Sequence, residues 1–186
     1  MSIVERNVSL TMTRASLAGV PGYLVPAGHA IRPYRPGDEQ TWFRIQSAAD
    51  RHNRITPGSF EREFGDDPDV LGRRLFFLLE PGGTAIGTAA AWFGDEHYGQ
   101  HMGRVHWVAI DPGHQGRGLS KPLLSKVCNV LAEMGHDEAY LVTSSGRVAA
   151  IRLYLHFGFA PAIDVPEAAA TWAELELILR SPRRAH

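Results

Sequence analysis

A glycine-rich junction between two apolar patterns constrains the fold of this chain more than any other feature. The junction reads DPGHQGRGLSKPLL at residues 111–124, and it follows the apolar run RVHWVAI at 104–110. Apolar side chains then recur at helical spacing, so the pattern predicts a strand that turns through glycines into a helix. Such a unit is typical of α/β proteins, in which helices pack against the faces of a sheet.

The same junction is a candidate anion site. A helix N-terminus exposes unpaired backbone N–H groups and the positive end of the helix dipole. Gly116 and Gly118 remove side chains where a ligand would approach, and Arg117 can add a charge-assisted hydrogen bond. The spacing excludes a Walker loop, because Leu119 follows the last glycine, and also the G-x-G-x-x-G dinucleotide fingerprint. A plain strand-to-helix turn and a pyrophosphate site both stay open.

The remaining patterns alternate between strands and helices. RRLFFLLE and TAIGTAAAWFGDE, joined by PGG, predict a β-hairpin, and the polar segment RHNRITPGSFEREFGDDPDVLG predicts a weakly helical, mobile cover over a cleft. In chain order we expect a strand at 30–34, a helix at 38–49, the cover at 51–72, strands at 73–80, 84–96 and 104–110, a helix at 119–131, a strand at 139–144, a helix at 147–158 and a strand at 171–179. These elements predict an α/β fold with a sheet of mixed direction.

The composition favours one domain without a large charged surface. A chain of 186 residues with 19 Lys+Arg, 20 Asp+Glu and a net charge of −1 has no basic field for nucleic acid or an anionic membrane. Cys128 is the single cysteine, which excludes a disulfide framework and suits a reducing compartment. No run approaches the roughly 20 apolar residues that span a bilayer, and the first residues do not resemble a signal peptide. We therefore expect a soluble, cytoplasmic protein without nucleic-acid or membrane partners.

The predicted domain occupies residues 29–180. An N-terminal extension at 1–28 is expected to pack on its core, and residues 181–186 form a tail. The extension contains NVSLTMTRAS, whose alternation is typical of an edge strand.

Two motifs of this chain resemble the GNAT superfamily of N-acetyltransferases. The family signature, Gln/Arg-x-x-Gly-x-Gly/Ala at the start of a helix after a buried strand, is matched by Gln115, Gly116, Arg117, Gly118 and Leu119, with Ser120 in place of the last small residue. AAIRLYLHFGF at 149–159 resembles the late helix of the family, with its tyrosine followed by Gly-Phe, and AIRPYRPGDE resembles its first strand and turn. The resemblance covers about residues 29 to 180. It implies a single domain with a mixed central β-sheet flanked by helices.

The resemblance also implies acetyl-CoA as the acyl donor. Its pyrophosphate would meet the N–H groups of Gln115, Gly116, Arg117, Gly118, Leu119 and Ser120. The pantetheine arm would pair like a strand with the backbone of Val108, Ala109 and Ile110. A backbone N–H of that strand would polarise the acyl carbonyl, an acceptor amine would attack directly, and the departing thiolate would take a proton. No metal is expected.

The catalytic candidates come from positions that match the family. Tyr154 occupies the position of the general acid, and a phenol with a pKa of about 10 is a sensible donor to a thiolate. Arg104 stands where the family often has a glutamate base, so we consider His106, two residues on and on the same face of the strand. Both side chains could instead be ordinary packed residues. Further candidates in the adjoining loop are Glu96, His97 and His101.

Two more regions are candidates for ligand contacts. The family often has an asparagine after the fifth strand that contacts the cofactor, and TSSGRVAA offers Ser144, Ser145 and Arg147 there, with Arg147 as a candidate for a phosphate. In relatives the acceptor binds at the early helix and the cover, where this chain offers Trp42, Arg51, His52, Asn53, Arg54 and Phe60. Of these, we select Trp42, His52 and Arg54 as acceptor-binding residues.

The resemblance implies transfer of an acetyl or short acyl group from acyl-CoA to a primary amine in a ternary complex. The acceptor is a small-molecule amine or a protein amine, and a homodimer stays open. The missing strand glutamate leaves an alternative, a non-catalytic acyl-CoA-binding sensor or regulatory subunit with the same fold. A third alternative is a phosphate-ligand module unrelated to CoA.

Overall fold

The computed structural model describes residues 1–94 and 102–180, which divide into two compact units. The central unit comprises Ser16–Ala139, and the terminal unit combines Met1–Ala15 with the chain from Tyr140 onward. The predicted extension 1–28 is therefore divided between the units, and the predicted tail, 181–186, lies outside the described residues. No helix of the described residues is long and apolar enough to cross a membrane.

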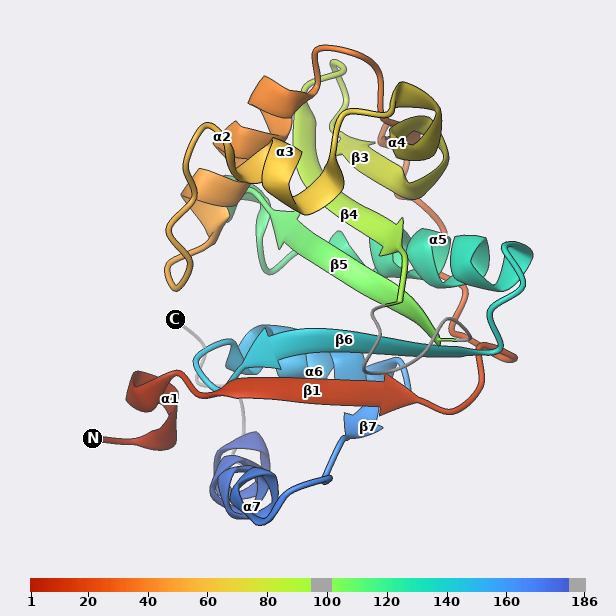
Figure 1. Ribbon diagram of the computed structural model, residues 1–186. Coiled ribbons are helices and arrows are strands. Elements are labelled where there is room, and N and C mark those ends of the chain that lie inside the picture. Colours follow the sequence, from red (N-terminus) through yellow and green to blue (C-terminus); the bar gives the residue numbers. More distant parts are fainter. Residues whose placement is uncertain (95–101, 181–186) are drawn as a thin grey trace. The chain divides into compact units, whose positions relative to one another are not determined.

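The central unit contains four antiparallel strands in the order β2-β3-β4-β5, of which β3, β4 and β5 are labelled in Figure 1. Its elements in chain order are β2 (Ala30–Pro33), α2 (Glu39–Ala49), α3 (Ser59–Phe64), α4 (Pro68–Arg74), β3 (Leu75–Leu79), β4 (Ala85–Trp92), β5 (Met102–Ile110), the short 3-10 helix η1 (Pro112–His114) and α5 (Ser120–Glu133). The predicted hairpin is confirmed as β3 and β4, and the predicted strand-turn-helix unit is confirmed as β5, η1 and α5.

Helices cover both faces of this sheet. Side chains alternate along a strand, so neighbouring residues of β3 point to opposite faces. Phe77 belongs to a core cluster with side chains of α2 and α3, whereas the adjacent Phe76 lies under Lys126 of α5, with 5.3 Å between the Nζ and the ring centroid. The apolar stripe of α5 faces the core, and its residue Leu123 is fully buried. Pro122 is tolerated because it lies in the first turn of the helix, where a backbone N–H has no helical partner.

The terminal unit contains three strands in the order β6-β1-β7. Its elements are α1 (Ile3–Arg6), β1 (Ser9–Arg14), β6 (Glu138–Ser144), which begins two residues before the unit boundary, α6 (Val148–His156), β7 (Ala160–Pro161) and α7 (Pro166–Arg180). The predicted edge position of β1 is wrong, because β1 lies between two strands and pairs antiparallel with β7. The alternation of polar and apolar residues indicates that the two faces of a strand differ. It does not indicate whether other strands pair with both of its edges.

The predicted strand at 171–179 is wrong, because these residues lie within α7. A strand would place Leu175 and Leu177 on one face, but Leu175 is fully buried while Leu177 is 71% exposed. Trp172 and Leu175, three residues apart, form the buried stripe of a helix instead. A short segment can fit both strand alternation and helical spacing. Here the helix-favouring run PEAAA precedes the alternating residues and favours the helix.

Candidate active site

The loop between β5 and α5 presents a row of backbone N–H groups. Gly116 and Gly118 have φ angles of +76° and +75°, a left-handed conformation that glycine adopts without strain. Among the described residues, the N–H groups of 116–120 have no hydrogen-bond partner, and no side chain caps α5. The loop from Gln115 to Gly118 is exposed. This arrangement can accept an anion at the positive end of the helix.

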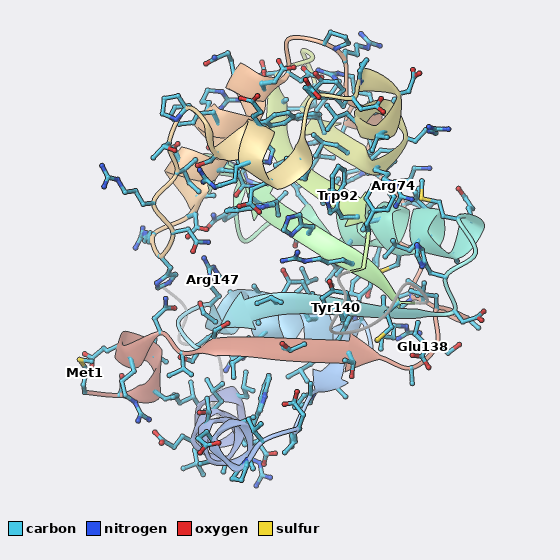
Figure 2. The ribbon with its side chains drawn as sticks, in the orientation of Figure 1. Met1, Arg74, Trp92, Glu138, Tyr140 and Arg147 are labelled. Carbon is cyan, nitrogen blue, oxygen red and sulfur yellow. The ribbon has the colours of Figure 1, made fainter. Side chains whose placement is uncertain are left out.

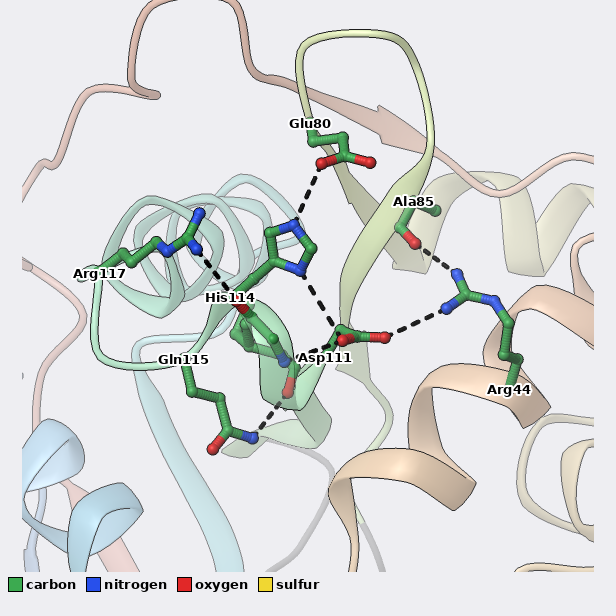
Figure 3. Close-up of polar contacts among 9 residues, drawn as sticks. Arg44, Glu80, Ala85, Asp111, His114, Gln115 and Arg117 are labelled. Atoms are coloured by element: carbon green, nitrogen blue, oxygen red, sulfur yellow. Dashed lines mark hydrogen bonds and ion pairs between the residues drawn. The ribbon is translucent and has the colours of Figure 1, made fainter. Parts of the chain in front are cut away.

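A polar network holds the start of this loop (Figure 3). Asp111 accepts a hydrogen bond from the N–H of Gly113 at 3.1 Å and pairs with Arg44 of α2 at 3.3 Å. His114 reaches in the other direction, with 3.1 Å between its Nε2 and Glu80 Oε2 at the end of β3. The loop is therefore fixed to α2 and to the β3–β4 hairpin before it reaches the exposed glycines.

Two predicted side chains of the loop bond to nearby backbone carbonyls. Gln115 donates from Nε2 to the carbonyl of Ile110 at 2.8 Å, and Arg117 donates to the carbonyl of Gly113 at 3.1 Å (Figure 3). Leu119 is buried and anchors the start of α5, and the side chain of Ser120 is half-buried. The groups that this loop offers to a ligand are therefore mainly backbone donors, together with the exposed guanidinium of Arg117.

β5 carries a bulge just before this loop. Ala90 of β4 pairs with His106, whereas Thr88 pairs with Ala109, so Trp107 and Val108 oppose one residue of β4. Trp107 has a φ of +48°, a left-handed conformation that costs a residue other than glycine about 1–3 kcal/mol. Bulges re-aim the strand and are frequent beside active sites. The predicted pantetheine segment, Val108 to Ile110, begins at this bulge.

Two helices hold the bulged tryptophan. The indole Nε1 of Trp107 donates to Glu63 Oε2 of α3 at 3.0 Å, and Gln46 Nε2 of α2 donates to the Trp107 carbonyl at 2.9 Å. Glu63 Oε2 also lies 3.4 Å from His106 Nε2. Hydrogen bonds from His106 and then Trp107, against the opposing effect of burial, lower the pKa of Glu63 to about 2. Glu63 is therefore ionised at neutral pH.

His106 does not have the ordinary acidity of a histidine. Burial lowers its pKa to about 4, with a further lowering by the charge of Arg104, while the hydrogen bond to Glu63 opposes the shift. The imidazole is thus neutral at neutral pH. Because an ionised carboxylate can only accept, the proton of the neutral ring belongs on Nε2, which faces Glu63. Burial therefore keeps the ring neutral where an ordinary histidine, with a pKa near 6.5, becomes charged, because a site inside the core disfavours the charged form.

The predicted acceptor residues lie in different environments. Trp42 is fully buried and packs edge-on against Phe60, Phe64 and Trp107, with 5.3 Å between the centroids of the two tryptophans. It can therefore act on a ligand only by shaping this aromatic cluster. His52 and Arg54, by contrast, are exposed in the segment after α2.

The segment 51–72 is more than a mobile cover. Phe60 and Phe64 of α3 and Leu71 of α4 are buried in the core cluster, so the expectation of a surface element was wrong for these residues. Trp92, at the end of β4, also packs against the cluster, with 4.9 Å between its ring centroid and that of Phe64 (Figure 2). The segment is polar overall, but its few apolar residues form a narrow stripe on one face of each short helix.

The terminal unit holds the other predicted residues. Tyr154 of α6 is buried, and its ring packs edge-on against Phe159. Arg147, labelled in Figure 2, precedes α6 and donates to Ser144 Oγ at 2.6 Å. Ser145 is fully buried and donates to the carbonyl of Ile3 at 2.6 Å, which anchors the N-terminus. Glu96, His97 and His101 lie outside the described residues.

Sequence reasoning missed Glu63, Gln46 and the conformation of Trp107. The spacing of Phe60 and Phe64 could have predicted α3, with Glu63 beside its buried stripe. No local signal links Glu63 to Trp107, which is 44 residues away. A contact of this kind depends on the fold and cannot be inferred from a pattern in one segment.

Comparison with known proteins supports the expected fold and family. Residues 40–159 match the model of the Acetyltransferase (GNAT) family, and this stretch runs continuously through both units, which are thus parts of one domain. Mycothiol acetyltransferase from Nocardia farcinica is 33% identical over 175 residues, which cover 86% of this chain and 55% of that protein. The chain thus spans about half the length of the curated relatives it matches.

Solved structures share the fold. A GCN5-related N-acetyltransferase from Sphaerobacter thermophilus has a TM-score of 0.66 at 24% identity, covering 83% of this chain and 48% of that chain. The yncA protein of Salmonella typhimurium, solved with its cofactor acetyl-CoA, has a TM-score of 0.57 at 22% identity, covering 70% of this chain and 78% of that chain. These similarities confirm the expected α/β fold with a mixed sheet flanked by helices.

Proposed function

Because the chain belongs to the GNAT family of acetyltransferases, we propose that it transfers an acetyl group from acetyl-CoA to a primary amine, by direct attack in a ternary complex. The observation that carries the proposal is the loop after β5. Its backbone N–H groups at 116–120 have no partner among the described residues and sit at the start of α5. A pyrophosphate has the charge and the acceptor oxygens that such donors bind.

In this proposal the backbone carries most of the donor recognition. Residues Gln115 to Ser120 bind the pyrophosphate, and the exposed Arg117 exchanges its contact with Gly113 for a phosphate oxygen. The backbone of Val108 to Ile110 pairs with the pantetheine arm. Arg147 stays a predicted phosphate contact, and this assignment rests on the resemblance. Acetyl-CoA serves as the acyl donor, and the chemistry needs no metal.

The reaction proceeds by one nucleophilic substitution at the acyl carbon. The neutral amine attacks the thioester carbonyl, a carbon–nitrogen bond forms, and the carbon–sulfur bond breaks with release of the thiolate. A backbone N–H at the β5 bulge stabilises the developing oxyanion, and Tyr154 donates a proton to the thiolate. His106 stays the candidate that accepts the proton of the amine, directly or through water.

The acceptor is a small-molecule amine or a protein amine that binds against α2 and α3. The exposed His52 and Arg54 offer polar contacts, and Trp42 shapes the aromatic cluster behind them. The matched relatives are named mycothiol acetyltransferases, so the substrate of that enzyme is the first candidate. A cytoplasmic location, a homodimer and the lack of nucleic-acid and membrane partners stay predictions from the sequence.

One observation favours a second candidate function. Arg104 stands in β5 where the family often has a glutamate base, and this supports an acyl-CoA-binding sensor or regulatory subunit without turnover. The two functions share the donor site and differ only in chemistry.

A thiol-release assay separates the two functions. The purified protein is incubated with acetyl-CoA and one amine at a time: the substrate of mycothiol acetyltransferase, a polyamine, an amino sugar, an amino acid, and peptides with a free N-terminus or lysine. Enzyme-dependent thiol release that requires one of these amines supports the transferase. Binding of acetyl-CoA without release on any amine supports the sensor.

A further inference from the structure

The conformation of Trp107 requires an explanation that the donor site alone does not provide. A bulky residue adopts a left-handed φ only when its surroundings hold it there, and such residues cluster at functional sites. Trp107 is held at two points, through its carbonyl and through its indole N–H, by residues from two different helices. Both helices belong to the central unit, as does β5.

The carbonyl contact bears directly on the site. The carbonyl of Trp107 and the N–H of Val108 belong to one planar peptide group, in which they point in opposite directions. Gln46 is only 2% exposed and donates to this carbonyl at 2.9 Å. Its buried amide therefore fixes the direction of the Val108 N–H, which points away from α2.

The indole contact fixes the other end of the residue. Glu63 accepts from Trp107 Nε1 at 3.0 Å and lies 3.4 Å from His106 Nε2, so two consecutive residues of β5 share one carboxylate oxygen. Arg62 lies near the other oxygen, with 3.9 Å between its Nε and Glu63 Oε1. A half-buried carboxylate with these donors is a rigid acceptor, since each bond restricts its rotamers.

We propose that Gln46 and Glu63 are positioning residues, which together hold Trp107 in its left-handed conformation and so aim the Val108 N–H at the acyl carbonyl. The inference rests on the proposed acetyl transfer and deepens it. Catalysis by a backbone donor depends on preorganisation, because a donor that must reorient during the reaction loses part of its effect. Loosening either contact therefore lowers kcat more than it weakens acetyl-CoA binding, which depends mainly on the loop after β5.

Single variants test the two contacts. Gln46→Leu and Glu63→Ala each lower kcat about tenfold, the effect of losing one well-aligned hydrogen bond, and change the KM for acetyl-CoA less than about twofold. Glu63→Gln retains an oxygen that accepts from the indole, so it restores most of kcat. Glu61→Ala, an exposed carboxylate on the same helix, is the matched control and retains wild-type rates. Thermal melting checks that each variant folds.

A double-mutant cycle tests whether Glu63 acts through Trp107. Trp107→Phe retains an aromatic ring and removes the indole donor. In that background Glu63→Ala lowers kcat by less than about threefold, because the contact is already lost. Equal losses in both backgrounds, or a Glu63→Gln variant as impaired as Glu63→Ala, would mean that Glu63 acts through His106 or on the amine rather than through Trp107, and the proposal would be overturned.

An NMR measurement decides the proposal independently of turnover. In ¹⁵N-labelled protein, Gln46→Leu and Glu63→Ala shift the Val108 amide and Trp107 indole resonances and speed their hydrogen exchange, whereas Glu61→Ala does not. Unchanged resonances and exchange in both variants would overturn the inference even if the enzyme is active. A wild-type protein that acetylates no amine would contradict the proposed function, while these spectra would still show whether the two residues hold the bulge.

Discussion

At the scale of single residues, His106 shows how burial changes a chemical role. Strand alternation predicted its position, two residues beyond the place of the family's usual base, but not its acidity. The side chain is 8% exposed, and burial holds its pKa at about 4, below the ordinary value of 6.5. Its partner Glu63 comes from a segment that the sequence placed in a mobile cover. The sequence could therefore identify His106 as a candidate, but not its electrostatic environment, which depends on a long-range contact.

The pH dependence of stability follows from these two groups. Both have lower pKa values in the folded than in the unfolded state, so the unfolded state binds more protons and stability falls on acidification. His106 contributes this loss between about pH 6.5 and 4, and Glu63 contributes between about pH 4.5 and 2. Urea denaturation at pH 7, 6, 5 and 4.5 measures the loss. His106→Gln flattens the part above about pH 5, and an equally steep curve in that variant would assign the loss to other groups.

Tyr154 provides the second prediction at this scale. Tyr154→Phe retains the ring contact with Phe159 and removes the hydroxyl, so we expect kcat to fall about 10²-fold while acetyl-CoA binding persists. Steady-state kinetics and calorimetry on the same preparation measure the two effects. An unchanged kcat would remove Tyr154 from the mechanism.

At the scale of elements, the sequence predicted the β3–β4 hairpin and the β5–α5 unit because their signals are local. Turn glycines and unbroken apolar patterns specify these elements without reference to the rest of the chain. The predictions for 51–72 and 171–179 were wrong for physical reasons. In α3, two buried phenylalanines are enough to pack the helix against the core, although its other residues are mostly polar. In α7, a short alternation of polar and apolar residues is also compatible with a helix.

The status of α3 as a core element is testable by stability. Phe64 is 5% exposed and contacts the rings of Trp42, Trp92 and His106. Phe64→Ala should lower the free energy of unfolding by about 3–5 kcal/mol, the usual cost of removing a buried aromatic ring. Urea denaturation at pH 7 measures the change. A loss below about 1 kcal/mol would support the mobile cover that the sequence suggested.

The loop after β5 is testable with two matched glycines at opposite ends of α5. Gly118 and Gly135 have φ angles of +75° and +86°, and a Cβ at either position meets no atom within 4 Å. Gly118→Ala and Gly135→Ala should therefore lose similar stability, about 1–2 kcal/mol. Only Gly118→Ala should weaken acetyl-CoA binding, by about tenfold, because its strain disturbs the row of N–H donors. Equal affinities in the two variants would contradict an anion site at this loop.

At the scale of the whole molecule, the family motifs predicted the fold class, whereas the donor-site residues stay a prediction. These motifs specify the local backbone conformation, and a few residues, such as the loop glycines, are enough to determine it. The proposed acceptor site is less predictable from the sequence, because it would combine exposed side chains of one segment with an aromatic cluster built from several segments. Trp42 illustrates the limit, since its aromatic character suggested a contact surface and its packing makes it part of the core.

Both proposed functions depend on acetyl-CoA binding at the loop after β5. Calorimetric titration with acetyl-CoA, dephospho-CoA and adenosine tests this binding. We predict saturable binding of acetyl-CoA and of dephospho-CoA, which retains the pyrophosphate, and no measurable binding of adenosine at the same concentrations. No heat of binding with acetyl-CoA, or equal affinity for adenosine, would contradict this prediction and leave residues 115–120 as a turn between a strand and a helix.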